Sequence, residues 1–276
     1  MANARPFRIL RPVLELLAKD GAPAYLVSPL LTRAGVRHCF STRVGGVSRS
    51  PFDSLNLGNP GGDIQDDWAN IHENYRRLQQ AIACNDLPRC WVHQVHGGDV
   101  AETRRGNAFE NGQRADALVG DDPGKLLAVR TADCVPVLLS TSDGRCVAAV
   151  HAGWRGVIAQ VIPSAIQRMR QIHQAPLLAA IGPAIGPDHF EVGQEVLAEF
   201  EARFSEGIGI SRRSGPGKGF VDLRRAIRAQ LLDAGVPDES IEMTGHCTFR
   251  DGELFYSHRR DRGVTGRMAA LIAAAG

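Results

Sequence analysis

The sequence predicts a layered domain of the α/β or α+β class with mixed sheets. Short apolar runs typical of strands alternate with amphipathic helical stretches, and the chain contains no internal repeat or low-complexity tract. Its 276 residues, 43% hydrophobic and 22% charged, are sufficient for one large buried core. We interpret residues 1–27 as an N-terminal extension with a helical stretch at L-E-L-L-A, and residues 28–276 as a single domain.

The first half of the domain begins with a predicted strand over residues 36–42, which leads into the Gly-rich segment S-T-R-V-G-G-V-S. Residues 66–84 form an amphipathic helix, because Trp68, Ile71, Tyr75, Leu78 and Ile82 recur at steps of three and four. Asp66 or Asp67 is available as its N-cap.

Five strands are then expected, at residues 90–95, 115–119, 126–134, 136–140 and 146–151. The last two flank the turn S-D-G-R and should pair as a hairpin. Residues 157–172 read as helical, with Pro163 either kinking that helix or marking its first turn. The run L-L-A-A-I-G at 177–182 is typical of a buried strand.

The C-terminal part predicts helices at residues 192–204 and 221–234, separated by the loop S-G-P-G-K-G. Strands are expected near residues 241–247 and 254–257, and a closing helix from Thr265 onwards.

Composition excludes several classes of partner. The formal net charge is only +2 and the Lys and Arg residues are scattered, so nucleic acid is not indicated. No apolar run is long enough to span a membrane, and the first residues lack a secretory signal, which predicts a cytoplasmic protein. Six cysteines without a C-x-x-C pair favour reduced thiols over disulfides. The oligomeric state stays open.

Three motifs predict a metal site. V-H-Q-V-H-G at 92–97, T-A-D-C at 131–134 and H-A-G-W-R-G at 151–156 place His96, Cys134 and His151 near strand ends, which commonly converge on a cleft. Zinc accepts imidazole nitrogen and thiolate sulfur, and three protein ligands leave its fourth tetrahedral position open for water or substrate. We expect a catalytic zinc site, with copper at the same residues as the alternative.

Two other readings of these residues stay open. Cys134 and His151 could form the nucleophile and base of a Cys-His hydrolase, because an imidazole beside a thiolate activates it for attack on acyl groups. A non-catalytic binding module is the other alternative. His93 is interpreted as a neighbour of the ligands or a surface residue, and His258, like the remaining histidines, as structural or exposed.

The chain resembles a bacterial family long described as laccase-domain or polyphenol oxidase proteins and now as purine nucleoside phosphorylases. The resemblance extends from about Val36 to the C terminus. It is carried by S-T-R-V-G-G-V-S, S-L-N-L-G, H-Q-V-H-G, A-D-A-L-V, T-A-D-C-V-P-V-L-L, H-A-G-W-R-G, I-G-P-A-I-G, F-E-V-G-Q-E-V and F-Y-S-H-R-R-D-R-G-V-T-G-R-M. One departure is His258, where the family usually has an aromatic residue.

The resemblance implies an α-β-β-α sandwich with mixed sheets and zinc held by His96, Cys134 and His151. It also implies phosphorolysis of adenosine, inosine, guanosine and methylthioadenosine, together with adenosine deamination. Relatives linked to cell-wall precursors make such precursors the substrate of the hydrolase alternative. A laccase-type copper cluster fits poorly, because the nine histidines include no H-x-H pair.

Four further residues are candidates for substrate binding or catalysis. Phosphorolysis needs cationic groups beside the phosphate, for which Arg43 is our first choice, with an exposed strand-end arginine as the alternative. Arg155 either binds substrate or braces its loop. Asp133 is a candidate acid or base, or simply fixes a turn, and Gln94 is a candidate contact to the purine base.

Overall fold

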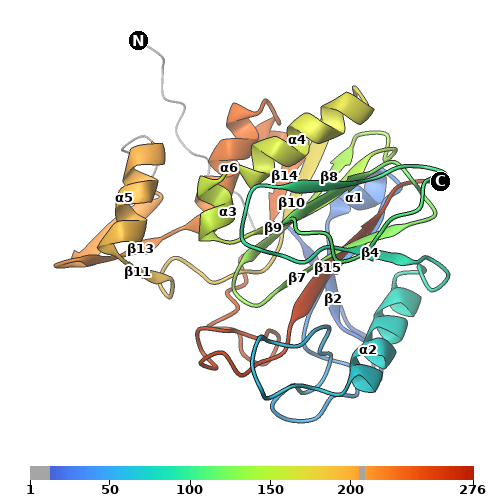
Figure 1. Cartoon of the computed structure of the whole chain (residues 1–276), viewed down its shortest axis with the longest axis horizontal. Helices are drawn as coiled ribbons and strands as arrows, with labels where there is room; N and C mark the ends of the chain where they lie inside the picture. The colour runs from blue at the N-terminus through green and yellow to red at the C-terminus, as the bar shows by residue number, and fades with distance from the viewer. Residues whose placement is uncertain (1–12, 205–208) are drawn as a thin grey trace.

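Two six-stranded sheets, packed face to face, form the centre of the molecule (Figure 1). The computed structural model describes residues 13–204 and 209–276. The first sheet has the order β1 (Glu15–Leu17), β2 (Tyr25–Val27), β3 (Arg37–Ser41), β15 (Met268–Ala273), β7 (Leu126–Thr131) and β4 (Arg89–Trp91). Its strands are antiparallel except for β4 beside β7.

The second sheet has the order β14 (Ile241–Met243), β10 (Leu177–Ile181), β8 (Val135–Thr141), β9 (Val147–Ala152), β6 (Ala117–Gly120) and β5 (Val100–Thr103). Strands β10 and β14 are parallel, as are β5 and β6, and the other pairs are antiparallel. Leu127, Val129, Leu138 and Ala149 are buried in the apolar layer between the two sheets. Burial of this layer is the main driving force that holds the sheets together.

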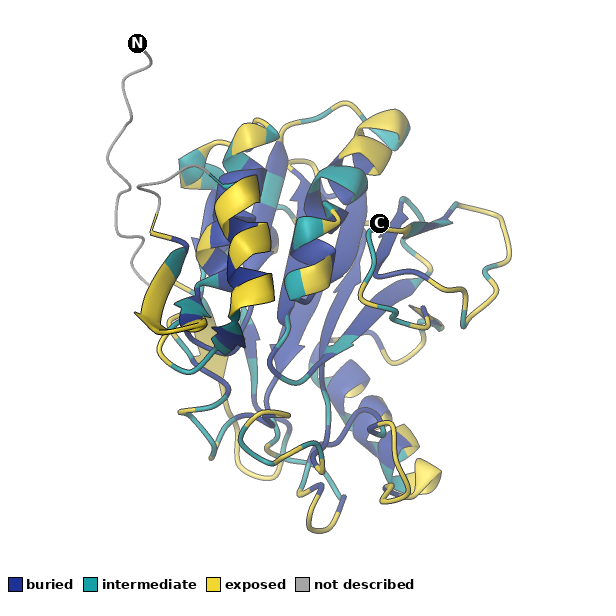
Figure 2. Cartoon of the chain, turned by 60° about the vertical axis from the view of Figure 1, so that its left-hand side comes forward, coloured by how far each residue is buried: buried dark blue, intermediate teal, exposed yellow. Residues whose placement is uncertain are grey.

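Helices cover the outer faces of both sheets. Helix α2 (Trp68–Ala81) packs on the first sheet, and α3 (Trp154–Ile158), α4 (Val161–Ile172) and α6 (Leu223–Asp233) pack on the second. Figure 2 shows the strands buried and the outward faces of the helices exposed. The α-β-β-α sandwich with mixed sheets is therefore confirmed.

Smaller elements complete the fold. Helix α1 (Pro29–Arg33) lies between β2 and β3, and a short 3-10 helix (Asp238–Ser240) precedes β14. A third sheet, β11 (Glu191–Gly193), β13 (Lys218–Val221) and β12 (Ser211–Gly215), projects to one side together with α5 (Gln194–Arg203) (Figure 1).

Local chemistry explains the elements that the sequence predicts correctly. Asp67 caps α2 by accepting a hydrogen bond from the backbone N–H of Ala69. Strands β8 and β9 pair as the expected hairpin. Pro163 lies in the first turn of α4, where it costs no intrahelical hydrogen bond, and a separate short helix, α3, precedes it.

The C-terminal helix expected from Thr265 is wrong. The run M-A-A-L-I-A forms β15, which is buried along its whole length between β3 and β7. An apolar run without polar interruptions carries no periodicity that separates a buried strand from a helix, and pairing on both edges decides the outcome. Residues 254–257, expected as a strand, follow a turn and form no strand, and Phe255 and Tyr256 are buried there.

Two further expectations need correction. The segment L-E-L-L-A contains strand β1 rather than a helix, and β2 pairs with β3, so residues 13–27 contribute to the first sheet. Residues 1–12 of the expected extension lie outside the described residues. The predicted loop S-G-P-G-K-G is the turn of the β12–β13 hairpin. Among the described helices, none has the length and apolar character needed to cross a membrane.

We expect Leu26→Ala to lower the free energy of unfolding by about 2–5 kcal/mol, because Leu26 of β2 is fully buried between the sheets. Leu16→Ala on β1 is the matched control; its side chain is 42% exposed, so the change should stay within about 0.5 kcal/mol. Urea unfolding measures both values. Equal stability of the two variants would contradict a structural role for β2.

Candidate metal centre

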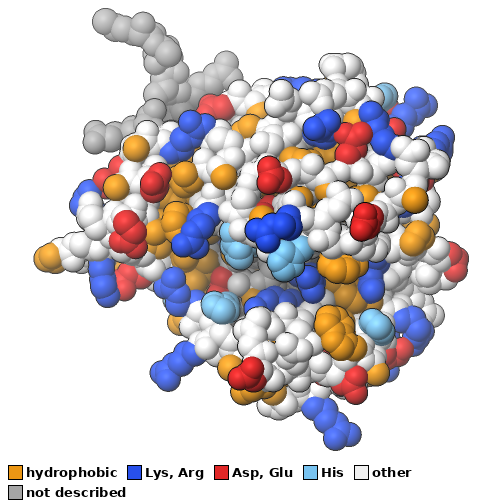
Figure 3. All heavy atoms as spheres, in the orientation of Figure 1, with side chains coloured by type: hydrophobic (Ala, Val, Ile, Leu, Met, Phe, Trp, Pro, Cys, Tyr) orange, Lys and Arg blue, Asp and Glu red, His pale blue; other side chains and the backbone are white. Residues whose placement is uncertain are grey.

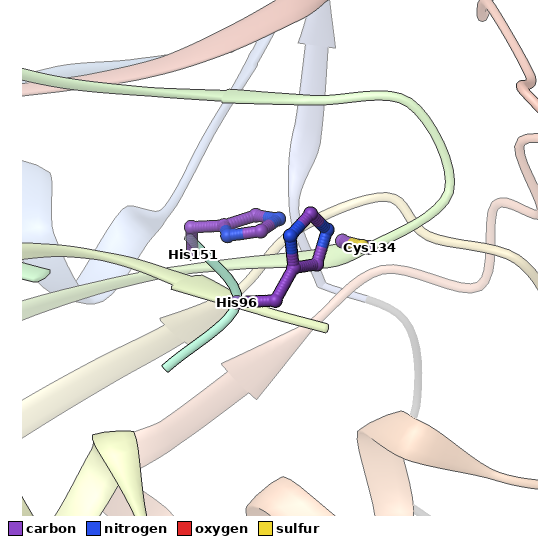
Figure 4. A group of neighbouring side chains, drawn as sticks. All are labelled: His96, Cys134 and His151. Carbon is purple, nitrogen blue, oxygen red and sulfur yellow. The ribbon is translucent and has the colours of Figure 1, made fainter. Parts of the chain in front are cut away.

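His96, Cys134 and His151 come together where the ends of the two sheets meet. His96 lies beyond β4, Cys134 lies in the turn between β7 and β8, and His151 belongs to β9. One ligand atom from each residue lies within 4.8 Å of the others, and Figure 4 shows the two rings and the sulfur pointing toward one another. Within residues 13–204 and 209–276, this is the one cluster of His, Cys, Asp or Glu with metal-ligand geometry.

The buried carboxylate of Asp116 fixes the positions of both histidines. Asp116 Oδ1 accepts hydrogen bonds from His151 Nδ1 at 2.8 Å and from the backbone N–H of His96 at 2.9 Å. Asp116 Oδ2 accepts from the backbone N–H groups of Val95 and Gly97 at 3.2 and 2.6 Å. These bonds hold His96 in a left-handed conformation with φ of 62°, which a non-glycine residue adopts only when its surroundings impose it.

The charges in the centre are coupled. Burial of Cys134 opposes its thiolate, but the positive charge of His151, together with hydrogen bonds from His151 and His96, outweighs burial and lowers the pKa of Cys134 to about 6. Burial likewise opposes a charged His151, but the Cys134 thiolate and Asp116 raise the pKa of His151 to about 9. Burial raises the pKa of Asp116, but the hydrogen bonds from His151 and from the N–H of Gly97 lower it by more. Asp116 therefore has a lowered pKa and carries a negative charge.

This donor set fits a zinc ion. Asp116 engages Nδ1 of His151, which leaves Nε2 of that ring for a metal, the usual carboxylate–histidine–metal arrangement. Gly153 gives the ligands the space they need, because a Cβ atom there would lie 3.0 Å from both Cys134 Sγ and His96 Cδ2. Two imidazole nitrogens and one thiolate suit zinc and also accept copper, so the donor set defines a metal site without fixing the ion.

The metal centre opens into a cavity of about 410 Å³ whose wall is cationic. On the face drawn in Figure 3, Lys or Arg and His side chains gather around a central hollow. The residues that line the cavity are Asn59, Gly61, His93, Gln94, His96, Arg130, Thr131, Ala132, Cys134, His151, His258 and Arg267. These lining residues include two arginines and four histidines but no Asp or Glu.

Of the other candidates from the sequence, only Gln94 lines this cavity. Its side-chain amide is paired with the backbone of Arg130, donating to the carbonyl oxygen and accepting from the N–H, both at 2.8 Å. Gln94 therefore ties the H-Q-V-H segment to β7. These two bonds occupy the side-chain amide that we expected to contact the base.

Arg43 and Asp133 are engaged in holding loops. The Arg43 guanidinium donates to the Asp53 and Gly252 carbonyl oxygens at 2.8 and 3.1 Å and lies over the Tyr256 ring. The two carboxylate oxygens of Asp133 accept hydrogen bonds from Thr248 Oγ1 at 2.6 Å and from a backbone N–H at 2.7 Å. These contacts support the alternatives in which Arg43 and Asp133 have structural roles.

Arg155 lies on the exposed side of α3, with its guanidinium over the Trp154 ring at 4.4 Å from the centroid. It is not among the residues that line the cavity. Packing against its own neighbour in the helix is the contact that the structure supports for this residue.

The sequence reasoning assigned no role at the site to Asp116, Arg130 and Arg267. Each of them lies in or beside an apolar run: Asp116 in A-D-A-L-V, Arg130 in L-L-A-V-R-T and Arg267 in T-G-R-M-A-A-L. A charged residue beside buried strand residues is costly to bury and is therefore a signal of function. His93, interpreted as a neighbour of the ligands or a surface residue, and His258, interpreted as structural or exposed, both line the cavity.

Comparison with known proteins agrees with this geometry. A family model described as "Multi-copper polyphenol oxidoreductase laccase" matches residues 37–275. "Purine nucleoside phosphorylase YfiH" of Escherichia coli (strain K12) is 42% identical over 240 residues, which cover 86% of this chain and 93% of the relative. "Purine nucleoside phosphorylase PA4543" of Pseudomonas aeruginosa is 40% identical over 250 residues, covering 90% and 98%.

Solved structures show the same architecture. YlmD from Geobacillus stearothermophilus superposes with a TM-score of 0.85 at 34% identity, covering 96% of this chain and 100% of that one. The Bacillus licheniformis hypothetical protein YfiH has a TM-score of 0.84 at 27% identity, with 94% and 98% covered. Fold and site thus define a class of α-β-β-α proteins with a His-Cys-His group between the sheet ends. The chain belongs to the polyphenol oxidoreductase laccase family whose model it matches.

We expect Asp116→Asn to weaken zinc binding by about 10–100-fold, because an amide cannot accept from both His151 Nδ1 and the three backbone N–H groups. Competition with a chromogenic chelator measures the affinity. Asp188→Asn is the control, since that side chain is 80% exposed. Unchanged zinc affinity in Asp116→Asn would contradict the role given to this carboxylate.

Proposed function

We propose that this protein is a zinc-dependent purine nucleoside phosphorylase that accepts adenosine, inosine, guanosine and methylthioadenosine and also deaminates adenosine. The relatives named purine nucleoside phosphorylase, about 40% identical along most of the chain, support this proposal. A cytoplasmic location, where such nucleosides occur with phosphate, is part of it. Copper at the same three residues is the alternative to zinc.

The observation that carries the proposal is the cavity in which a metal-binding group and a cationic wall without Asp or Glu face the same space. In phosphorolysis a phosphate oxygen forms a bond to C1′ of the ribose while the C1′–N9 bond breaks and the purine leaves with the bonding electrons. The nucleophile is an anion, and the departing purine gains a proton. A cationic wall binds the anionic nucleophile, and histidines can supply the proton to the purine.

The residues of the chain prepare this chemistry before substrate binds. His96, Cys134 and His151 would hold the zinc ion, which would supply Lewis-acid chemistry that suits hydrolytic deamination. Asp116 keeps a proton on Nδ1 of His151 and so fixes which nitrogen faces the cavity. His93 and His258, on the cavity wall, are the groups available to move a proton to or from the purine.

One observation favours a second function. Asp116, His151 and Cys134 are arranged in the order of a carboxylate, an imidazole and a thiol, and the lowered pKa of Cys134 is typical of a Cys-His nucleophile pair. A hydrolase acting on cell-wall precursors would use Cys134 for attack on an acyl group. Metal binding and nucleophilic attack need the same sulfur, so stoichiometric zinc on Cys134 in the active protein would exclude this alternative.

We expect zinc-loaded protein to convert adenosine to adenine and ribose 1-phosphate only when phosphate is present, with inosine as a second product. Chromatographic separation of adenine, inosine, hypoxanthine and ribose 1-phosphate, with and without phosphate, measures this. Loss of a residue that only supports a metal ligand lowers metal affinity or activity by about 10–100-fold. Loss of a ligand itself, in Cys134→Ala, should therefore lower both the phosphorolysis and the deamination of adenosine by at least about 100-fold.

Cys146→Ala is the matched control, because this thiol is buried at the start of β9 and its pKa is raised to about 12 by burial. It should keep full activity. Turnover of acyl-linked cell-wall precursors without any turnover of purine nucleosides would reject the proposal in favour of the hydrolase.

A further inference from the structure

Two arginines line the cavity without a carboxylate partner. Arg130, in β7, and Arg267, directly before β15, both border the cavity beside the metal centre. Among the described residues, neither guanidinium forms a salt bridge. Other arginines of the chain do pair with a nearby carboxylate, as Arg43, Arg77, Arg104 and Arg260 show. Two positive charges therefore face the same enclosed space.

The position of Arg130 is determined by its neighbours. Gln94 holds its backbone through two hydrogen bonds of 2.8 Å, and the Trp91 ring centroid lies 5.8 Å from the guanidinium carbon. The side chain crosses Gly58, where an added Cβ atom would lie 2.8 Å from Arg130 Cδ and 2.9 Å from Nη1. A side chain at this position of S-L-N-L-G would therefore displace the Arg130 side chain from its present position.

Arg267 is held by the same buried segment. Its backbone N–H donates to Asn56 Oδ1 at 2.9 Å, and its carbonyl accepts from the N–H of Leu57 at 2.9 Å. One guanidinium nitrogen, Nη1, donates to the Thr265 and Gly266 carbonyl oxygens at 3.0 and 3.1 Å. The other two nitrogens have no hydrogen bond within the described part of the chain, so donors are available for a ligand.

The two arginines also act on each other electrically. Burial, followed by the positive charge of Arg130, lowers the pKa of Arg267. Bringing two like charges together in a half-buried wall is unfavourable unless an anion binds between them. The negative charges that act on Arg267 are the Cys134 thiolate, a ligand of the candidate metal centre, and Asp133, whose two carboxylate oxygens are engaged in other hydrogen bonds.

We propose that Arg130 and Arg267 form the binding site for the phosphate that attacks the nucleoside, a tetrahedral oxyanion held beside the His-Cys-His centre. Guanidinium groups present forked N–H donors that match phosphate oxygens, and each such charge-assisted contact is strong. The role of the anion as nucleophile rests on the proposed phosphorylase function. The binding of the anion does not.

Free phosphate and the phosphate group of a nucleotide share this chemistry, and two ligands distinguish them. Isothermal titration of the zinc-loaded protein with inorganic phosphate, and separately with adenosine 5′-monophosphate, measures the affinities. We expect Arg130→Gln and Arg267→Gln each to weaken inorganic phosphate binding by about 10–100-fold. Arg145→Gln is the control, because that side chain is 75% exposed in the β8–β9 turn, and it should leave the affinity unchanged.

Steady-state kinetics supply the second measurement. The two Gln variants should raise the KM for phosphate by a similar factor while the KM for adenosine changes less than about threefold. Arg130→Lys keeps the positive charge but not the forked donors, so it should recover part of the affinity. Thermal unfolding of each variant establishes that it is folded.

The outcomes separate the two proposals. If no purine nucleoside is turned over but inorganic phosphate binds with the expected dependence on both arginines, the phosphorylase function fails and the anion site stands. If turnover needs phosphate but neither substitution changes its KM or affinity, the anion site fails and the function stands. Arginine-dependent binding of adenosine 5′-monophosphate without binding of inorganic phosphate would overturn the assignment to the co-substrate.

Discussion

The site depends on the buried carboxylate of Asp116. Its two oxygens accept one hydrogen bond from His151 and three from successive backbone N–H groups around His96, so one charge fixes both histidines. Asp116 itself directly precedes β6 of the second sheet, whereas the segment around His96 follows β4 of the first. The carboxylate therefore connects the two sheets close to the β7–β8 turn, in which Cys134 lies. The three candidate ligands come together only when the sandwich has formed.

The buried segment S-L-N-L-G plays the equivalent part on the other side of the cavity. Asn56 and Leu57 hold the backbone of Arg267, and Gly58 leaves the space that the Arg130 side chain crosses. Leu55 and Leu57 anchor the segment in the apolar layer beneath α2. Packing of this segment against α2 thus determines where the two arginine side chains lie. The motif S-L-N-L-G is therefore necessary for the site although it contains no reactive group.

How far the sequence could predict this protein depends on the range of the interactions. The helix α2 and the β8–β9 hairpin follow from local periodicity and turn residues, and the three ligand candidates follow from His and Cys at strand ends. Strand β15 could not be recognised, because its apolar run fits a helix equally well until β3 and β7 pair with its two edges. Arg130 and Arg267 lie 137 positions apart in numbering and meet only through the sheet order β15–β7.

The distribution of charge links the metal centre to the arginine pair. At the metal centre, Asp116 and the Cys134 thiolate carry negative charges. A divalent metal ion or a protonated His151 balances these charges. Within the described residues the two guanidinium groups form no salt bridge with a carboxylate, and among the negative charges near Arg267 the Cys134 thiolate acts on it most strongly. Oxidation of a neutral phenol would gain little from two arginines beside the metal centre, whereas binding of an anionic co-substrate would use them. The electrostatics of the cavity therefore support the proposed transfer to phosphate better than they support phenol oxidation.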